Sequence, residues 1–224
     1  MPMNGRCALK IGSCEYPDSL LYDTDAGTWA RREGELVRIG IAPHLSWITG
    51  GFTSVSIKPI GSEVKEGKNL GSVEGPRHFD VVKAPFDCII KDANSALHSS
   101  PRLVNKDPFG QGWLVVVEQI TLASRLLPLA EAAESLHALV ERLNVHCFSE
   151  FPDSEMFEIG VECSAVLVRL NEEIAKRERG WVTHIVSDDP TSDIEMARWE
   201  DQTGNKVVEV VREGNLQHFI VRKS

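Results

Sequence analysis

The chain has 224 residues, of which 42% are apolar and 25% are charged, and its formal net charge is −9 at pH 7. These values are typical of a globular protein with one large domain or two small ones. The negative charge argues against general nucleic-acid or anionic-membrane binding, because both need a basic surface. The sequence has no apolar run near the ~20 residues of a membrane-spanning helix, and residues 1–16 lack the apolar stretch of a secretory signal. We therefore expect a cytoplasmic protein.

The cysteines are odd in number and scattered, at Cys7, Cys14, Cys88, Cys147 and Cys163. This distribution argues against a disulfide framework. Their spacing matches no zinc-finger pattern, so we predict no metal site. Cys7 and Cys14 are read either as a redox pair or metal ligands, or as two cysteines without a chemical role. Residues 16–22 then predict a turn that leads into a short strand.

From Thr28 to Leu122 the sequence consists of short, β-branched runs separated by Gly- and Pro-containing turns. Each run has the length of a strand, and the pattern predicts a small β-barrel or sandwich. The predicted strands are 29–33, 35–42, 53–59, 68–75, 80–85, 88–94 and 112–120.

This region resembles the glycine cleavage system H protein family from about Tyr22 to about Ile120. The residues that carry the resemblance are Gly40–Ala42, Ile60–Gly67, Gly71–Glu74, Ala84-Pro85, Asn94, Leu97, Pro101–Asn105 and Asp107–Leu114. The resemblance implies a lipoyl-domain-like barrel-sandwich hybrid that ends in a helix. It also implies a lipoate-bearing lysine three residues after the glutamate that corresponds to Glu74.

In this chain Arg77 occupies the lipoyl-lysine position, at the tip of a hairpin predicted across Gly71–Pro85. Lipoylation forms an amide on a neutral amine, whereas a guanidinium stays protonated and delocalised. We therefore predict that Arg77 is not lipoylated and that the protein carries no lipoate. Lys83 is predicted on the returning strand, away from the tip. Glu74, Arg77 and His78 are read either as a recognition tip for an anion or a partner's carboxylate, or as a solvated polar turn.

Residues 122–147 predict an amphipathic helix, because apolar residues recur there at three- and four-residue steps. Its narrow apolar stripe suits either docking on the barrel or a coiled-coil seam. The polar, proline-containing stretch 148–155 predicts a linker. The chain is thus divided into a barrel domain at 1–121, the helix, the linker and a second domain at 156–224.

The second domain is predicted to follow the order β-α-β-α-β-β, which is typical of a two-layer α+β domain. The predicted strands are 156–163, 181–189, 206–214 and 216–223, and the predicted helices are 164–179 and 190–203. Glu213-Gly214-Asn215 predicts a hairpin turn between the last two strands.

This second domain resembles the TusA-like (SirA-like) sulfur-carrier family. The residues that carry the resemblance are Gly160–Cys163, Arg169, Ser187–Pro190, Trp199, Thr203–Asn205 and Arg222-Lys223. The resemblance implies that Cys163 carries sulfane sulfur as a persulfide and passes it from one partner protein to another.

Some features of the sequence around Cys163 favour a persulfide carrier, and others argue against it. A helix N-terminus favours a thiolate or persulfide anion, and Arg169 is a candidate anion stabiliser in the same helix. Against this, the family's Cys-Pro-x-Pro pattern is replaced by Ser164, Ala165 and Val166, and Glu162 places a negative charge beside the thiol. A buried, inert cysteine is the alternative interpretation.

Three functions follow from these patterns. The preferred hypothesis is a non-lipoylated H-like protein fused to a sulfur-carrier domain, with sulfur donors, sulfur acceptors and lipoate-handling or glycine cleavage enzymes as partners. The second is a lipoyl carrier that uses another lysine, of which Lys83 is the nearest. The third is a scaffold protein without chemistry. Each describes a carrier or scaffold rather than a stand-alone enzyme, and sulfur transfer is the one enzymatic activity left open.

Overall fold

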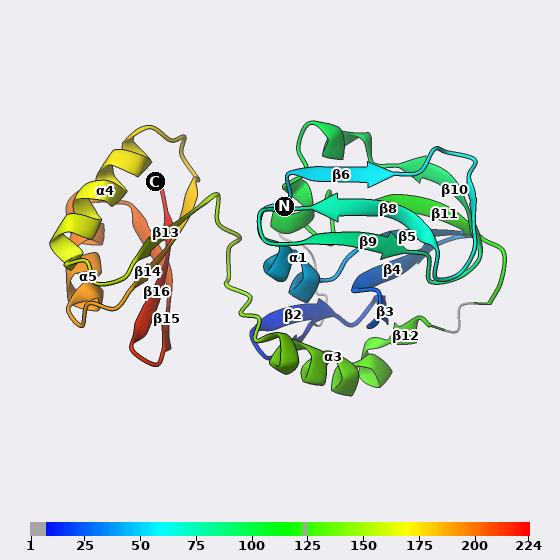
Figure 1. The fold of residues 1–224 in the computed structure, drawn as a ribbon, viewed down its shortest axis with the longest axis horizontal. Coiled ribbons are helices and arrows are strands. Elements are labelled where there is room, and N and C mark those ends of the chain that lie inside the picture. The colour runs from blue at the N-terminus through cyan, green and yellow to red at the C-terminus, as the bar shows by residue number, and fades with distance from the viewer. Residues whose placement is uncertain (1–7, 123–124) are drawn as a thin grey trace. The chain divides into compact units, whose positions relative to one another are not determined.

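The structure is a computed structural model of the chain and describes residues 8–122 and 125–224. By its internal contacts the chain divides into two compact units, residues 1–147 and 148–224 (Figure 1). Within the described residues, no helix is both long enough and apolar enough to span a membrane. The two units are described separately.

The first unit is built from antiparallel strands in three sheets. Its strands are β1 (Ala8–Ile11), β2 (Cys14–Pro17), β3 (Leu21–Asp23), β4 (Thr28–Glu33), β5 (Leu36–Ile41), β6 (Ser54–Ile57), β7 (Glu63–Val64), β8 (Asn69–Glu74), β9 (Phe79–Lys83), β10 (Cys88–Ala93), β11 (Val115–Gln119) and β12 (Leu127–Pro128). The sheet orders are β12-β3-β4-β5-β11-β10-β7, β6-β8-β9 and β1-β2. The seven strands predicted between residues 29 and 120 are all present, and they build the β-sandwich that the sequence pattern predicted.

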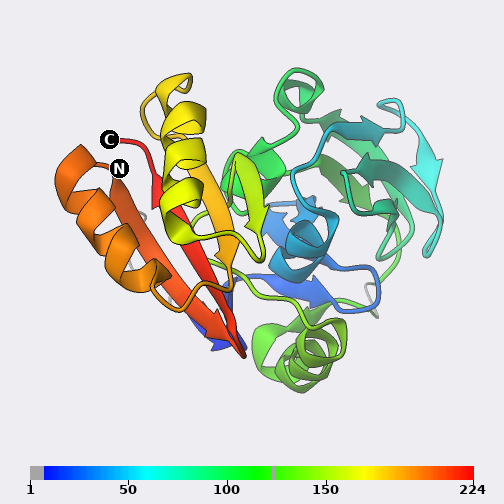
Figure 2. The ribbon, with the colours of Figure 1, turned by 60° about the vertical axis from the view of Figure 1, so that its left-hand side comes forward.

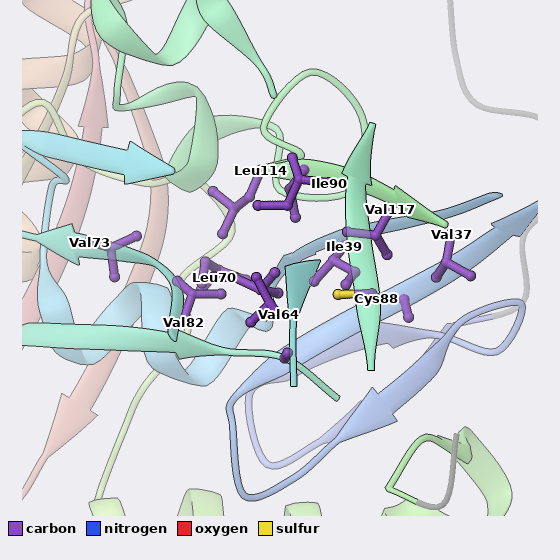
Figure 3. Packing of buried hydrophobic residues seen from close by; sticks show 14 of the residues in the cluster. Val37, Ile39, Val64, Leu70, Val73, Val82, Cys88, Ile90, Leu114 and Val117 are labelled. Carbon is purple, nitrogen blue, oxygen red and sulfur yellow. The ribbon is translucent and has the colours of Figure 1, made fainter. Parts of the chain in front are cut away.

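One buried cluster fills the interior of this sandwich. Alternate residues of β5, namely Val37, Ile39 and Ile41, point into it, as the two-residue repeat of a strand requires. Figure 3 shows side chains from β5, β7, β8, β9, β10 and β11 converging on this space. Burying each Val, Leu or Ile contributes roughly 1.5–3 kcal/mol, so this cluster is a main source of stability for the unit. Cys88 is fully buried here, and burial raises its pKa to about 11.

Four short helical elements complete the first unit: α1 (Pro43–Thr49), the 3₁₀ helix η1 (Ser95–His98), α2 (Leu103–Lys106) and α3 (Leu129–Leu143). Neither α1 nor α2 was predicted. Pro43 lies in the first turn of α1, where its missing N–H costs little, and the helix ends at Gly50, whose φ of 78° few other residues adopt.

The helix predicted across 122–147 is shorter in the structure, and its predicted start is wrong. Leu122 is 92% exposed, and Leu127-Pro128 form β12, which pairs with β3. Proline lacks an N–H and disfavours the helical conformation in the residue before it, so the helix begins only after Pro128. The predicted amphipathic character is confirmed, because α3 buries Leu129, Ala132, Leu136 and Val140 along one face.

The sequence argued against a disulfide framework, but one pair of cysteines is bonded in the structure. Cys14 and Cys147 are disulfide-bonded, with their Cα atoms 4.9 Å apart and a sequence separation of 133 residues. An odd cysteine count and wide spacing do not exclude such a pair, because the fold brings β2 beside the end of α3. Cys7, the other half of the suggested redox pair, lies outside the described residues.

The second unit has the predicted order β-α-β-α-β-β. Its elements are β13 (Ser154–Glu158), α4 (Cys163–Ala175), β14 (Val182–Ser187), α5 (Ser192–Thr203), β15 (Lys206–Glu213) and β16 (Leu216–Arg222). The sheet order is β13-β14-β16-β15, with β13 and β14 parallel and the other pairs antiparallel. Ser154 and Glu155, which were predicted in the linker, are the first residues of β13.

Both helices of the second unit cover the same face of the sheet, where α4 and α5 lie side by side (Figure 2). Val166 and Leu170 of α4 and Trp199 of α5 pack on Ile185 and Phe219 of the sheet. Trp199 Nε1 also donates a hydrogen bond to Asn171 Oδ1 at 2.8 Å, which joins the two helices. A two-layer arrangement results within this unit.

Candidate functional site

The tip of the β8–β9 hairpin is the turn Gly75–His78. Glu74 pairs with Phe79 at the ends of the two strands, and the Gly75 N–H donates to the His78 carbonyl at 3.0 Å. Arg77 and His78 are exposed in this turn, where the sequence placed them. Lys83 is on β9 opposite Asn69, at the far end of the hairpin from the turn, so its placement on the returning strand is confirmed.

Arg77 folds back from the turn onto the C-terminal end of α1. Its backbone N–H donates to the Thr49 carbonyl at 3.3 Å, and its Nη2 donates to the Trp47 carbonyl at 3.2 Å. The last carbonyl groups of a helix lack partners within the helix and form the negative end of its dipole. The guanidinium therefore supplies both a hydrogen bond and a complementary charge at the end of α1.

Two glycines allow the tip to approach α1 this closely. A Cβ at Gly75 would lie 2.6 Å from the Thr49 carbonyl oxygen, and a Cβ at Gly50 would lie 3.1 Å from Arg77 Nε. Both distances are shorter than ordinary van der Waals contacts of a Cβ. The tip and the end of α1 thus form one close-packed surface feature, which we call the tip platform: residues 47–50 together with 74–79.

Asn105 of α2 holds the end of α1 from beneath. Its Oδ1 accepts a hydrogen bond from the Phe52 N–H at 2.8 Å, and its Nδ2 donates to Ser46 Oγ at 2.8 Å and to the Gly50 carbonyl at 3.0 Å. Only 7% of Asn105 is exposed, so these polar groups have little access to water. The sequence included Asn105 only as part of the resemblance. The sequence analysis did not predict its supporting role. The one indication in the sequence was a polar residue directly after the apolar pair Leu103-Val104.

The N-terminal end of α1 is fixed by a buried pair, His44 and Tyr16. The Tyr16 hydroxyl lies 2.9 Å from His44 Nδ1, and His44 is only 2% exposed. Burial lowers the pKa of His44 to about 4 and raises the pKa of Tyr16 above its usual value. At neutral pH His44 is therefore uncharged, and its Nδ1 shares a hydrogen bond with the tyrosine hydroxyl.

Acidification should weaken the first unit through His44. Its pKa is about 4 in the folded chain, against about 6.5 when unfolded. Between these values the unfolded chain binds the proton more readily, so stability is present above pH 6.5 and falls as the pH drops to 4. The expected loss is about 3 kcal/mol, taking ~1.4 kcal/mol per pKa unit. Urea unfolding of the chain at a series of pH values measures it.

The His44→Gln variant is the control, since glutamine keeps a hydrogen-bonding side chain but does not titrate. Its unfolding free energy should change much less between pH 6.5 and 4.5 than that of the natural chain. Equal slopes in the two proteins would show that His44 is not the group responsible.

In the second unit, Cys163 is the first residue of α4, at the carboxyl ends of the parallel strands β13 and β14. The loops that follow these strands are joined by two aspartates. Asp188 Oδ1 accepts from the Gly160 N–H, and Asp189 Oδ2 accepts from the Cys163 N–H, each at 2.7 Å. Hydrogen bonds from Thr191 and from the Cys163 N–H hold the pKa of Asp189 below its usual value. The carboxylate of Asp189 is therefore charged at neutral pH.

The Cys163 thiol is covered, with 3% of the residue exposed. Burial raises its pKa, the charges of Asp189 and Glu195 add to the rise, and a hydrogen bond with Ser192 partly offsets it. The thiol is therefore protonated at neutral pH. The sequence attributed a raised pKa to Glu162, whereas the structure gives burial as its largest cause.

Arg169, the proposed anion stabiliser, binds a carboxylate in the structure. Its Nη1 pairs with Glu158 Oε2 at the end of β13, and Glu158 is 8% exposed. The positive charge of Arg169 is thus largely engaged by Glu158. Within the described residues, no group of three or more His, Cys, Asp or Glu side chains is placed to hold a metal ion.

Comparison with known proteins concerns the first unit. The chain is similar to glycine cleavage system H protein 5 of Aquifex aeolicus, with 32% identity over 145 residues that cover 62% of this chain and 98% of the relative. The H protein of Mycobacteroides abscessus is 38% identical over 110 residues, which cover 49% of this chain and 83% of that protein. The crystal structure of an H protein from Mycobacterium marinum matches with a TM-score of 0.50 and 27% identity, covering 54% of this chain and 98% of that one.

The family model of the glycine cleavage H-protein matches residues 20–142. This segment is more than half of the chain, and it contains α1, α2 and the β8–β9 hairpin of the tip platform. The chain belongs to the glycine cleavage H-protein family.

Proposed function

We propose that this protein is an H-type scaffold without the lipoyl arm, and that its tip platform is a recognition surface for proteins that handle H proteins. The observation that carries the proposal is the fixed side chain of Arg77. It occupies the position of the family's lipoyl-lysine, and it donates to the Trp47 carbonyl at the end of α1. A guanidinium held in this way is neither a neutral amine nucleophile nor a free arm.

The composition of the tip platform supports a role in binding another protein. Phe79 is 58% exposed beside Glu74, Arg77 and His78. Aromatic residues and arginine are the residue types that are enriched at protein interfaces. The close packing on α1 keeps the tip in one shape before a partner arrives, which lowers the entropy cost of binding.

Treatment of the full chain with lipoate ligase, ATP and lipoate tests the first half of the proposal. Intact mass spectrometry should show no added lipoyl group, while a lipoylatable H protein in the same reaction is modified. A lipoyl group on Lys83 would contradict the proposal and support the alternative, a lipoyl carrier. Membership of the H-protein family favours that alternative, which needs a lysine other than the residue at position 77.

Binding of the same ligase to the full chain, measured by calorimetry, tests the second half. Phe79→Ala should weaken this binding by at least about tenfold if Phe79 is a central contact residue. Phe157→Ala is the matched control, because Phe157 is also exposed, at 63%, but lies in the second unit. Equal effects of the two substitutions would contradict a recognition role for the tip platform.

A second candidate function is sulfur transfer by Cys163, in a domain that resembles TusA-like carriers. The position of Cys163 at the carboxyl ends of β13 and β14 favours it, because α/β sheets bind their ligands at such ends. The reaction would join a sulfane sulfur of a donor to the Cys163 sulfur and release the donor's remaining group. Since the thiol is covered and protonated, the loops 159–162 and 188–191 must open before it reacts.

The reactivity of Cys163 should reflect this protection. At pH 7 we expect alkylation by iodoacetamide much slower than for an exposed thiol, with a rate that rises about tenfold per pH unit below the thiol pKa. Asp189→Asn should raise the rate, because it removes a charge that raises the pKa of Cys163. Peptide mass spectrometry follows the adduct, and Cys88, with a pKa of about 11, is the internal reference.

Incubation with inorganic polysulfide tests the carrier role itself. Persulfide should form on Cys163 and should be absent there in Cys163→Ala. Persulfide on other cysteines only would contradict sulfur transfer by this site. The scaffold function of the tip platform would be unaffected by that result.

A further inference from the structure

The Cys14–Cys147 disulfide lies where the chain leaves the first unit. Cys147 is the last residue of this unit, and Cys14 is the first residue of β2. The bond therefore connects the β1–β2 hairpin to the residue that directly precedes the second unit. In the first unit, α3 lies next to β2 (Figure 1).

Further interactions fix the same segment. The Cys147 N–H donates to Ser13 Oγ in the β1–β2 turn at 2.7 Å. Asn144 ends α3 in the left-handed conformation with φ of 46°, and the Val145 N–H donates to the Val140 carbonyl at 3.3 Å. Cys147 is thus held against the β1–β2 turn by the disulfide and its hydrogen bond to Ser13, while Asn144 and Val145 are bonded to the last turns of α3.

Neither cysteine lies within the segment that matches the H-protein family. That segment is 20–142, so Cys14 precedes it and Cys147 follows it. The disulfide joins two flanking segments to each other, and neither half-cystine belongs to the main cluster inside the sandwich. The sandwich core is therefore built without it.

The reduced cysteines would fit where they are. Cys14 is 0% exposed and Cys147 is 7% exposed, and both lie in an apolar cluster with Tyr16, Tyr22 and Trp29. A free cysteine behaves as a small apolar side chain in such surroundings. Reduction would remove the covalent tie without introducing a charge into the cluster at neutral pH.

We propose that the Cys14–Cys147 disulfide is a redox-controlled clasp that fixes the end of the first unit, residues 144–147, to the β1–β2 hairpin. In the oxidised chain, residues 144–147 are fixed to the first unit. In the reduced chain, these residues detach more readily from the β1–β2 turn. The sandwich and the tip platform stay folded in both states.

The reduction is a two-electron exchange with a dithiol. A thiolate of the dithiol attacks the sulfur of Cys147, the more exposed residue of the two, and Cys14 leaves as a thiolate and is protonated. The second thiolate of the dithiol then attacks the first sulfur of the same dithiol, which is bonded to Cys147 in the mixed disulfide. The Cys147 thiol is released, and the dithiol becomes a cyclic disulfide.

Hydrogen exchange of the full chain, with and without dithiothreitol, tests the proposal. Peptide mass spectrometry after alkylation first shows whether Cys14 and Cys147 are reduced while the protein is folded. The amides of 144–147 and of β1–β2 should then exchange at least about tenfold faster, as expected for loss of a local tie. The amides of β5 and β11 are internal references and should keep their rates. Trypsin should also cut faster after Arg142, in the last turn of α3.

Variants distinguish the effect of the disulfide from that of the neighbouring hydrogen bond. The double variant Cys14→Ala/Cys147→Ala should match the reduced chain under both conditions and should not respond to dithiothreitol. Ser13→Ala removes the hydrogen bond to Cys147 but keeps the disulfide, so it should still respond.

Three results would overturn the proposal. The disulfide would be a static brace if dithiothreitol reduced it only after global unfolding. It would have no controlling role if reduction left exchange at 144–147 unchanged. It would be essential for the fold if reduction, or the double alanine variant, raised exchange throughout β5 and β11.

Discussion

Replacing Arg77 by lysine is expected to turn a chain that lipoate ligase leaves unmodified into one that carries a single lipoyl group. Lysine can lose its proton locally and act as an amine nucleophile, whereas the arginine guanidinium cannot. The hairpin around residue 77 keeps its turn, with the Gly75 N–H bonded to the His78 carbonyl. The substitution also removes the guanidinium that binds the Trp47 carbonyl, so the new side chain is free to leave the surface. Intact mass spectrometry after reaction with ligase, ATP and lipoate measures the change.

Two further variants assign the modified residue. Arg77→Ala removes the same guanidinium without adding an amine and should stay unmodified. Arg77→Lys combined with Lys83→Ala should be modified as fully as Arg77→Lys alone. If Arg77→Lys stays unmodified while a lipoylatable H protein reacts, the tip has lost the shape that the ligase recognises. The proposed recognition surface would then lose its main support.

The sequence predicted the strands of the sandwich well because their signal is local. In β5, for example, Val37, Ile39 and Ile41 alternate with Arg38 and Gly40, and such a pattern needs no knowledge of the partner strand. The exposed turn at Arg77 and the β9 position of Lys83 followed in the same way from the hairpin signal. Helix α1 was missed because it is a single short helix with a proline in its first turn, and its four buried residues before Thr49 are consecutive rather than periodic.

Features that depend on distant residues were not accessible from the sequence. The disulfide joins residues that are 133 positions apart, and only the fold brings them together. The bond between Arg77 and the Trp47 carbonyl has the same character, since it joins a hairpin to a helix 30 residues earlier. The surroundings of Cys163 include Asp189 in the loop after β14 and Ser192 at the start of α5, both more than 25 residues away in sequence. The sequence could name the cysteine, but it could not give its exposure.

The tip platform depends on Asn105, a buried residue. Arg77 donates hydrogen bonds to the Trp47 and Thr49 carbonyls in the last turn of α1, so the position of the tip depends on the end of that helix. Gly50 and Phe52 follow the end of α1. The Gly50 carbonyl accepts a hydrogen bond from the Asn105 side chain, and the Phe52 N–H donates one to it. A short helix has little stability of its own. The hydrogen bonds of the Asn105 amide therefore help to hold the end of α1, and with it the tip platform, in position.

Asn105→Ala is therefore expected to lower the free energy of unfolding of the first unit by about 4 kcal/mol, since it leaves buried groups at Phe52 and Gly50 without partners at ~1–3 kcal/mol each. Urea unfolding measures the loss. Ser46→Ala, which removes only the hydroxyl partner of Asn105, should cost about 1 kcal/mol. In the Arg77→Lys background, Asn105→Ala should also slow lipoylation in conditions where the chain is still folded, because the end of α1 no longer holds the hairpin in place. A stability loss without any change in lipoylation rate would show that Asn105 supports the fold but not the tip platform.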